Sequence, residues 1–242
     1  MNYNVVSLFH GMGSWTEPMG DNVNIWSNDN NIDFKDHTTH IGDFMDIEAD
    51  TIREYFNGER IDFLAASIPC QCFSVASIGV HWGGGAFGYR PKTQAAFESI
   101  ALVRHTMKII AALDPRYFVI ENPRGMLRKL GPLNHLERVT VWYCQYGPTA
   151  GVLRAKPTDL WGVFPPSWKP RPPCKNHTFE NGVKTSTHCN HEAARRGMDS
   201  GNNRIRGAVL RSLVPQELCQ ELWAAVISKN DRLYPNARGV LI

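Results

Sequence analysis

The sequence predicts an α/β fold in which a mainly parallel sheet carries helices on both faces. Two observations lead to this prediction. Short apolar runs of strand length recur along the chain and alternate with segments of helical periodicity. Glycine, acidic and cysteine residues follow directly after the ends of these runs. Because ligands of such sheets bind outside the carboxyl ends of the strands, we expect these residues to converge on one crevice.

The candidate strands are five apolar runs, at residues 4–9, 23–27, 61–67, 117–120 and 139–144. The first breaks into a turn that contains Gly11 and Gly13, which is typical of a buried strand end. Apolar residues at helical spacing predict a helix over residues 94–113. A last helix fits residues 216–227.

Length and composition are those of an ordinary soluble protein with one full α/β domain and a small appendage. The chain has 242 residues, of which 43% are hydrophobic and 20% charged, so it can bury a sizeable core. No apolar run approaches the roughly 20 residues that a membrane span needs, and no basic n-region precedes the first strand. We therefore expect a cytoplasmic protein. Its six cysteines would be reduced there and would serve catalysis, metal binding or packing.

The charges are unevenly distributed. The net charge is only +3, but residues 1–62 carry an acidic excess and residues 116–211 are rich in Arg and Lys. This asymmetry favours a protein that holds a cofactor with its first part and a polyanion with its second. A solvated mixture of surface charges explains it about as well.

The texture of the chain changes near residue 165. Prolines then recur up to residue 173, and residues 175–203 are polar with little helix or strand pattern. We therefore divide the chain into a catalytic domain over residues 1–165, a small irregular insert over 166–207 and a C-terminal helical segment over 208–242.

Residues at three strand ends could carry chemistry. Cys70 could be a reactive thiolate if a helix N-terminus follows it, although a cysteine taken alone is more often a packing residue. Glu121 could donate a proton in a closed site, and a helix-capping role is an equal alternative. Gly11 and Gly13 would let the backbone approach a cofactor closely.

Taken together, these motifs resemble those of the C5-cytosine methyltransferase family. Residues 69–74 (Pro-Cys-Gln-Cys-Phe-Ser) match its nucleophile loop, Glu121-Asn122 its Glu-Asn pair, and residues 7–13 its cofactor turn. Residues 143–147 with Arg154 and Lys156 look like its basic strand, and residues 212–215 like its C-terminal motif. The resemblance covers residues 5–163 and 208–227 and is greatest to compact phage and prophage members.

The chain also departs from the family pattern. Pro123 stands where the family usually has Val, and Lys156 where a second arginine is usual. Extra residues separate Gly147 from Arg154, which leaves the exact pairing of these cations with the base open. Arg211-Ser212 replaces the usual Gly-Asn pair of the last motif.

The resemblance implies a Rossmann-like class I methyltransferase fold and the activity of a DNA (cytosine-5)-methyltransferase, typical of restriction-modification systems. S-adenosylmethionine would be the methyl donor and double-stranded DNA the partner of a monomeric enzyme. Catalysis would rest on Cys70 as nucleophile, Glu121 as proton donor, and Arg154 and Lys156 as cations at the base. The implied cofactor-binding residues are Phe9, His10, Gly11, Met12, Gly13, Asp29, Asn30, Asp43, Phe44 and Pro69.

The resemblance also implies that the target cytosine is flipped out of the duplex. The glycine-rich segment 75–90 would then be a mobile lid over the base, and a disordered surface loop is the alternative. Gln71 and Ser74 would contact DNA from the nucleophile loop.

Two hypotheses concern the insert. The spacing of Cys174, His177, Cys189 and His191 is near that of zinc ligands, so a structural zinc ion is one interpretation, and surface polar groups or DNA contacts are the other. Arginines of the insert suit phosphate and major-groove contacts, with solvated loop residues as the alternative: Arg195, Arg196, Arg204 and Arg206.

Three functions remain open at this point. The first is methylation of cytosine in DNA, and the second is methylation of cytosine in RNA such as tRNA, because relatives that modify tRNA share this catalytic set. The third is a catalytically silent DNA-binding protein. The joint presence of Cys70, Glu121 and Arg154 argues against the third.

Overall fold

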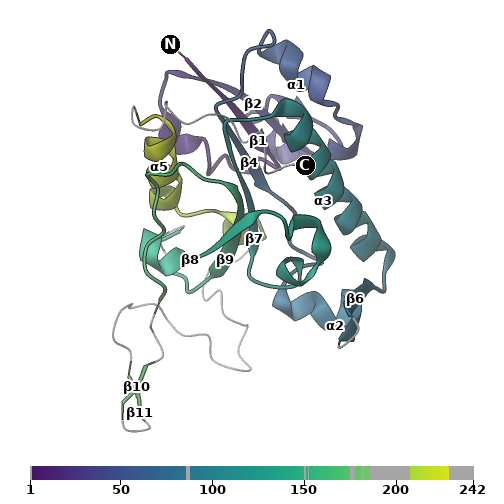
Figure 1. Ribbon diagram of the computed structural model, residues 1–242, viewed down its shortest axis with the longest axis vertical. Helices are drawn as coiled ribbons and strands as arrows, with labels where there is room; N and C mark the ends of the chain where they lie inside the picture. Colours follow the sequence, from purple (N-terminus) through teal and green to yellow (C-terminus); the bar gives the residue numbers. More distant parts are fainter. Residues whose placement is uncertain are drawn as a thin grey trace.

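A mainly parallel sheet forms the centre of the molecule. The computed structural model describes residues 2–85, 88–149, 151, 153–174, 178–180, 183–185 and 208–228. Among these residues, seven strands form one sheet in the order β3-β2-β1-β4-β7-β9-β8 (Figure 1). The strands are β1 (Tyr3–Leu8), β2 (Val23–Asp29), β3 (His40–Ile41), β4 (Phe63–Ser67), β7 (Tyr117–Pro123), β8 (Glu137–Trp142) and β9 (Pro157–Val163). From β3 to β7 neighbouring strands are parallel, whereas β9 is antiparallel to both β7 and β8.

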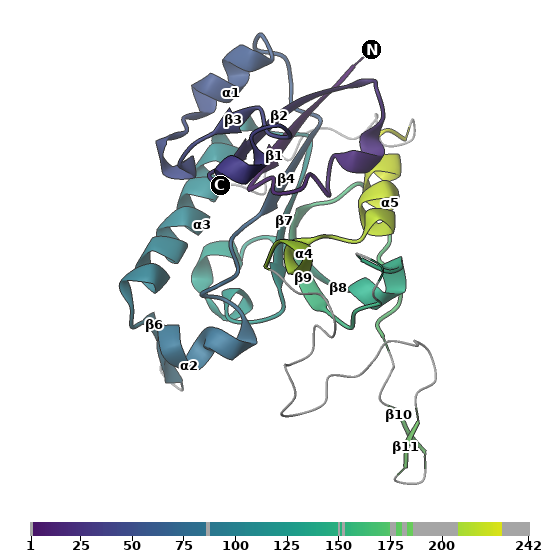
Figure 2. The ribbon, with the colours of Figure 1, turned by 180° about the vertical axis from the view of Figure 1, so that it is seen from behind.

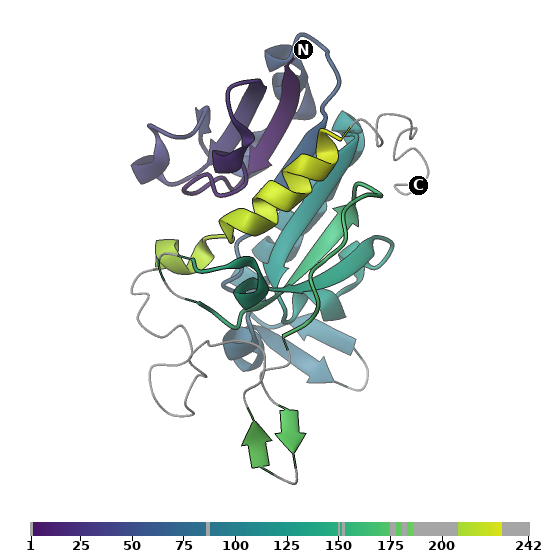
Figure 3. The same cartoon turned by 90° about the vertical axis from the view of Figure 1, so that its left-hand side faces the viewer.

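Helices cover both faces of this sheet, which confirms the predicted fold class. Helices α1 (Ala49–Tyr55) and α3 (Gln94–Leu113) lie on one face, and α5 (Gln216–Val226) lies on the other (Figures 2 and 3). The short helix α4 (Ala208–Ser212) precedes α5. In the described part of the chain, no helix combines the length and apolar character that crossing a bilayer requires.

Alternating strand residues fill two hydrophobic cores. Val6 and Leu64 point into the core beneath α1 and α3, whereas Val5 and Ala65 point into the core beneath α5. Because both faces are buried, the central strands are apolar at successive positions rather than at alternate ones. This is why they stand out in the sequence as continuous apolar runs.

Helix α3 begins and ends at the predicted residues. The side chain of Thr93 accepts a hydrogen bond from the backbone N–H of Ala96 and so caps the N-terminus. Asp114 adopts a left-handed conformation at the C-terminus, and Pro115 follows.

Shorter elements connect these strands and helices. Helix α2 (Ile78–His81) precedes a hairpin of β5 (Trp82–Gly85) and β6 (Gly88–Pro91), and a second small hairpin pairs β10 (Thr178–Glu180) with β11 (Val183–Thr185). The second hairpin lies in the segment for which the sequence indicated little strand pattern. The 3-10 helices are η1 (Glu17–Met19), η2 (Ile32–Phe34), η3 (Phe44–Asp46), η4 (Val75–Ser77), η5 (Leu127–Lys129), η6 (Gly131–Leu133) and η7 (Tyr143–Tyr146).

Strand β9 was not predicted from the sequence, and β8 ends earlier than predicted. Strand β9 contains Thr158 and Asp159, which are polar yet fully buried, so it does not form an apolar run. Strand β8 ends at Trp142, and the next four residues form η7 instead of continuing the strand to residue 144.

An ion pair between the half-buried Arg128 and the fully buried Asp159 holds the antiparallel part of the sheet. Arg128 Nε lies 3.0 Å from Asp159 Oδ2, and Arg128 Nη2 donates to Asp159 Oδ1 at 3.1 Å. The hydroxyl of Thr140 donates to the same Oδ1 at 2.6 Å. These contacts join β9 to β8 and to η5, so they fix the hairpin that lies beside β7.

We expect Asp159→Ala to destabilise the protein strongly, because it removes the buried carboxylate that pairs with the Arg128 guanidinium. The expected loss is about 3 kcal/mol in the free energy of unfolding, measured by urea denaturation. Asp50→Ala is the control, since the Asp50–Arg53 pair is exposed and should contribute less than about 1 kcal/mol. Equal losses in the two variants would contradict the role assigned to Asp159.

Candidate functional site

The strand order brings most of the sequence-predicted site residues to one edge of the sheet. Strands β2, β1, β4 and β7 are parallel neighbours, so their carboxyl ends lie at the same edge. The cofactor turn follows β1, Asp29 ends β2, the Cys70 loop follows β4, and Glu121 lies near the carboxyl end of β7. Ser67 pairs directly with Glu121 in the sheet, so Cys70 is three residues beyond that pair.

The Cys70 loop is tied to the end of β7. The side-chain amide of Asn122 donates to the carbonyl of Ile68 at 2.8 Å, and the N–H of Met126 donates to the carbonyl of Phe73 at 2.7 Å. Within the loop, the carbonyl of Cys70 accepts from the N–H groups of Phe73 and Ser74. The Cys70 side chain is half-buried. The loop therefore has a fixed path, and the amide of Asn122 orients it.

Gly125 lets the two segments approach each other closely. A Cβ atom on this residue would lie 2.2 Å from the carbonyl oxygen of Phe73, far inside contact distance. A side chain at this position would therefore push the backbone of the Cys70 loop away from β7.

Glu121 lies in a cluster of buried polar groups. Its side chain is 4% exposed, and the hydroxyl of Tyr143 donates to its Oε1 at 2.9 Å. Lys156 Nζ lies 3.8 Å from the same oxygen. Lys156 was predicted from the sequence to lie near the reacting base, whereas no role was predicted for Tyr143.

Arg154 also lies near Tyr143. Its guanidinium carbon lies 6.0 Å from the centroid of the Tyr143 ring, and Lys156 Nζ lies 4.8 Å from it. Arg154 Nη2 also donates to the carbonyl of Leu213 at 3.1 Å. The structure therefore brings three of the four predicted catalytic residues, Glu121, Arg154 and Lys156, around one tyrosine.

Burial controls the ionisation of this cluster. It raises the pKa of Tyr143 well above its usual value, and the neighbouring Glu121 carboxyl raises it further. Tyr143 is therefore a hydrogen-bond donor that keeps its proton at any physiological pH. Burial also lowers the pKa of Arg154, against the opposing effects of Tyr143 and Glu121.

The predicted cofactor turn is held to the end of β2. Phe9, Gly11 and Gly13 all have positive φ angles, so the chain turns sharply after β1. Asp29 accepts the N–H of Gly11 on Oδ2 at 2.8 Å and the N–H of Asn31 on Oδ1 at 2.9 Å. A Cβ on Gly11 would meet no atom within 4 Å, so space is open beside the turn.

The other predicted cofactor residues divide into exposed and packed positions. Met12, Asn30, Asp43 and Pro69 are exposed at this edge of the sheet. Asp43 caps η3 by accepting the N–H of Met45. The ring of Phe44 is buried against Phe9 and His105, so its side chain packs the core beneath the turn.

The C-terminal motif contacts the cofactor turn. The N–H of Val214 donates to the hydroxyl of Ser14 at 3.3 Å, although the two residues lie 200 positions apart. Arg171 lies in the first part of the proposed insert. Its side chain pairs with Glu217 and Glu221 of α5, and its backbone N–H donates to the hydroxyl of Tyr146. The first residues of the proposed insert are therefore attached to the body of the protein.

The described residues of the predicted lid segment, 75–85 and 88–90, lie mostly in regular secondary structure. The segment contains η4, α2 and the β5–β6 hairpin. Trp82 is buried, stacks on Phe73 and donates its indole N–H to the carbonyl of Cys72 at 2.6 Å. The lid is thus anchored directly to the Cys70 loop. Whether it moves over a substrate stays a prediction. Gln71 is exposed beside it, and Ser74 is half-buried and contacts Ser77.

Most of the hypotheses about the insert lie outside the described residues. Cys174 is described and half-buried, but the other three candidate zinc ligands, His177, Cys189 and His191, are not described. Nor are the four arginines expected to contact DNA: Arg195, Arg196, Arg204 and Arg206. No group of three or more His, Cys, Asp or Glu residues that could hold a metal occurs in the described part of the chain. The zinc and DNA-contact hypotheses therefore stay predictions.

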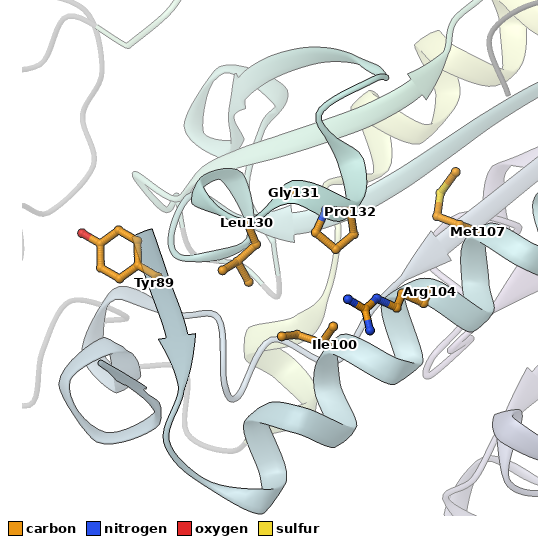
Figure 4. A pocket seen from close by; sticks show the side chains of 7 residues that line it. All are labelled: Tyr89, Ile100, Arg104, Met107, Leu130, Gly131 and Pro132. Atoms are coloured by element: carbon orange, nitrogen blue, oxygen red, sulfur yellow. The ribbon is translucent and has the colours of Figure 1, made fainter. Parts of the chain in front are cut away.

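A separate pocket of about 480 Å³ lies between α3 and η6. Ile100, Arg104 and Met107 of α3 face Leu130 and Pro132 across it, and Tyr89 of the lid stands at one end (Figure 4). None of its lining residues is among those predicted to serve catalysis or cofactor binding.

We predict that Gly125→Ala displaces the Cys70 loop, because its Cβ would overlap the carbonyl of Phe73. The expected cost is about 1–3 kcal/mol of stability, together with a change in the alkylation rate of Cys70 measured by peptide mass spectrometry. Gly131→Ala is the matched control, since a Cβ there meets nothing within 4 Å. A Gly125→Ala variant with wild-type stability and Cys70 reactivity would refute the close approach.

We also predict that His10 makes the fold sensitive to acid. Burial lowers its pKa from 6.5, and the nearby Asp29 only partly opposes this. Since the unfolded chain binds the proton more tightly, the contribution of His10 is complete above about pH 6.5 and is lost as the pH falls below that value. His10→Gln should therefore lose less stability than the wild type between about pH 7 and about pH 5, measured by urea denaturation. Parallel pH profiles would contradict this.

Several known proteins are similar to this chain. A curated protein of Frog virus 3, described as a "probable DNA (cytosine-5)-methyltransferase", is 29% identical over 119 residues. The match covers 48% of this chain and 55% of the viral protein, so this chain spans about half of that relative's length. A crystal structure described as a "putative DNA modification methyltransferase" encoded within an Escherichia coli prophage is 18% identical with a TM-score of 0.47. The match covers 67% of this chain and 47% of that protein. The Entamoeba histolytica methyltransferase EhMeth is 12% identical with a TM-score of 0.45, covering 77% and 58%.

The family comparison covers the central part of the site. Residues 3–140 match the family described as C-5 cytosine-specific DNA methylase. This segment is more than half of the chain and contains both Cys70 and Glu121, although it ends before Tyr143, Arg154 and Lys156. The chain therefore belongs to the C-5 cytosine-specific DNA methylase family.

Proposed function

We propose that this protein transfers a methyl group from S-adenosylmethionine to carbon 5 of cytosine in double-stranded DNA. The observation that supports this most is the attachment of the Cys70 loop to β7 beside the Glu121 cluster. This attachment holds the Cys70 thiol and the buried Glu121 carboxyl group at the ends of two adjacent strands. Two cations lie near the carboxyl group.

The proposed chemistry begins with covalent catalysis, because carbon 5 of cytosine is a weak nucleophile. The Cys70 thiolate adds to carbon 6 while Glu121 gives a proton to ring nitrogen 3, so the electron pair of the ring double bond becomes available at carbon 5. After carbon 5 is methylated, it loses its proton to a solvent base. The electrons of that carbon–hydrogen bond re-form the double bond between carbons 5 and 6 and expel the Cys70 thiolate, while ring nitrogen 3 returns its proton to Glu121. Lys156 and Arg154 stabilise charge on the base oxygen and the carboxyl group.

The residues after β1, β2 and β3 suit S-adenosylmethionine as the methyl donor. The Gly11 turn leaves open space, and the carboxylates of Asp29 and Asp43 have accepting capacity beyond their one or two backbone bonds. We assign the donor's binding to Phe9, His10, Gly11, Met12, Gly13, Asp29, Asn30 and Asp43, to the backbone of Phe44 and to Pro69. When bound, S-adenosylmethionine supplies the methyl group.

Duplex DNA is the proposed partner. Carbon 6 of a stacked cytosine is out of reach of a thiol, so the target base must be flipped out. We propose that the lid covers the flipped base, that Gln71 and Ser74 contact the DNA, and that the insert over 166–207 recognises the target sequence. We further propose that the enzyme acts as a cytoplasmic monomer, with residues 1–165 and 208–242 forming its catalytic body.

We predict that Cys70→Ser abolishes methyl transfer, because a hydroxyl is far less nucleophilic than a thiolate. The assay follows labelled methyl groups from S-adenosylmethionine into duplex DNA, and the expected loss is about a thousandfold or more. Cys144→Ala removes a buried cysteine without an assigned role and should keep the activity within about threefold.

The same assay separates the alternative functions. Methylation that survives in Cys70→Ser would refute the assigned nucleophile. Stronger labelling of tRNA than of duplex DNA would favour the RNA-modifying alternative. Binding of DNA with no labelling of either polymer would identify a catalytically silent relative.

A further inference from the structure

Tyr143 occupies an unusual position in the candidate site. It is the first residue of η7, its side chain is fully buried, and its hydroxyl makes a direct hydrogen bond to Glu121. Both described contacts of the Glu121 carboxyl, from Tyr143 and from Lys156, are made to the same oxygen, Oε1. One side of the carboxyl group is thus occupied by protein donors.

The tyrosine ring also contacts the two candidate cations. Lys156 Nζ and the Arg154 guanidinium lie 4.8 and 6.0 Å from its centroid. The tyrosine is held in turn by its backbone, because its N–H donates to the carbonyl of Lys156 at 3.2 Å. A single side chain therefore contacts Glu121, Arg154 and Lys156.

We propose that Tyr143 is a positioning residue that holds Oε1 of Glu121 and so presents Oε2 to ring nitrogen 3 of the cytosine. This inference rests on the proposed function. The Tyr143 hydroxyl donates to Oε1, so this oxygen accepts a hydrogen bond when Glu121 is ionised, and the same bond is kept in the neutral acid when its proton is on Oε2. The proton that Glu121 gives to the base therefore resides on Oε2, the oxygen assigned to the base.

The same hydrogen bond distinguishes the ionised form of Glu121 from the neutral form. A donor stabilises the ionised carboxylate more than the neutral acid. The positive charges of Lys156 and Arg154 act in the same direction, whereas burial favours the neutral acid. The Cys219 thiol of α5 also faces the group, with its proton retained because burial raises its pKa, and Cys70 lies on the adjacent loop. Loss of the tyrosine hydroxyl should therefore make Glu121 bind its proton more tightly.

Tyr143→Phe tests this, since it keeps the ring and removes only the hydroxyl. The pH profile of methyl transfer should shift its basic limb to higher pH by about one unit. The value of kcat should fall by about tenfold or more, whereas KM for S-adenosylmethionine should stay within about twofold. Tyr146→Phe is the matched control from the same 3-10 helix, because its hydroxyl bonds to Arg171 instead. This control should keep the wild-type pH profile.

Two results would overturn the proposal. One is a Tyr143→Phe variant with the pH profile and kcat of the wild type, and the other is the same shift in Tyr146→Phe, which would indicate a general structural effect. Replacing tyrosine biosynthetically by 3-fluorotyrosine provides a second route if Tyr143→Phe does not fold. The fluorinated phenol is a stronger donor, so the basic limb should move to lower pH, and an unchanged limb would count against the proposal.

A titration that needs no turnover separates this inference from the proposed function. The carboxyl carbon of Glu121, labelled with carbon-13 and identified through Glu121→Gln, can be followed by NMR. Its titration midpoint should be higher in Tyr143→Phe than in the wild type, and equal midpoints would refute the hydrogen bond's role. An inactive wild type in the methylation assay would refute the proposed function instead.

Discussion

The site depends on the attachment between the loop after β4 and the end of β7. Parallel strands bring the two segments to one edge of the sheet, but they do not by themselves fix how the loops beyond the strands run. The amide of Asn122, the N–H of Met126 and the missing side chain of Gly125 do this, because they hold the loop carbonyls of Ile68 and Phe73 against β7. The position of Cys70 relative to Glu121 follows from these contacts.

The antiparallel end of the sheet supplies the remaining groups. Strand β9 runs back beside β7, so Lys156, just before β9, comes close to Glu121 at the end of β7. The Arg128–Asp159 pair fixes the β8–β9 hairpin from its buried side. Tyr143, which directly follows β8, then donates to the carboxyl group and lies beside the two cations. The reversal of strand direction is therefore what carries donors to the carboxyl group.

The predictable features were those that depend on local sequence patterns. The parallel strands and the bounds of α3 follow from apolar periodicity and from local caps such as Thr93. Strand β9 was missed because Thr158 and Asp159 are polar, and only distant partners such as Arg128 and Thr140 make their burial possible. The order of the lid depends on Trp82, whose partners Phe73 and Cys72 precede it by nine or ten residues and show no helical or strand period.

The candidate site likewise contains residues that local motifs identify and residues that only the folded structure identifies. Cys70 and Glu121 could be identified because they lie in short motifs at strand ends. The role of Tyr143 could not, because its hydrogen bond to Glu121 joins residues 22 positions apart on different elements. The packing of Phe44 and the backbone contacts of Asp29 likewise depend on how neighbouring strand ends meet.

Trapping the covalent intermediate is the decisive experiment on the proposed role of Cys70. A duplex that carries 5-fluorocytosine at the target position cannot lose a proton from carbon 5, so an adduct formed in the presence of S-adenosylmethionine should persist through denaturation. We expect peptide mass spectrometry to locate the DNA on Cys70 and on no other cysteine. An adduct on a different residue, or methylation of ordinary duplex DNA without any trapped adduct, would contradict it.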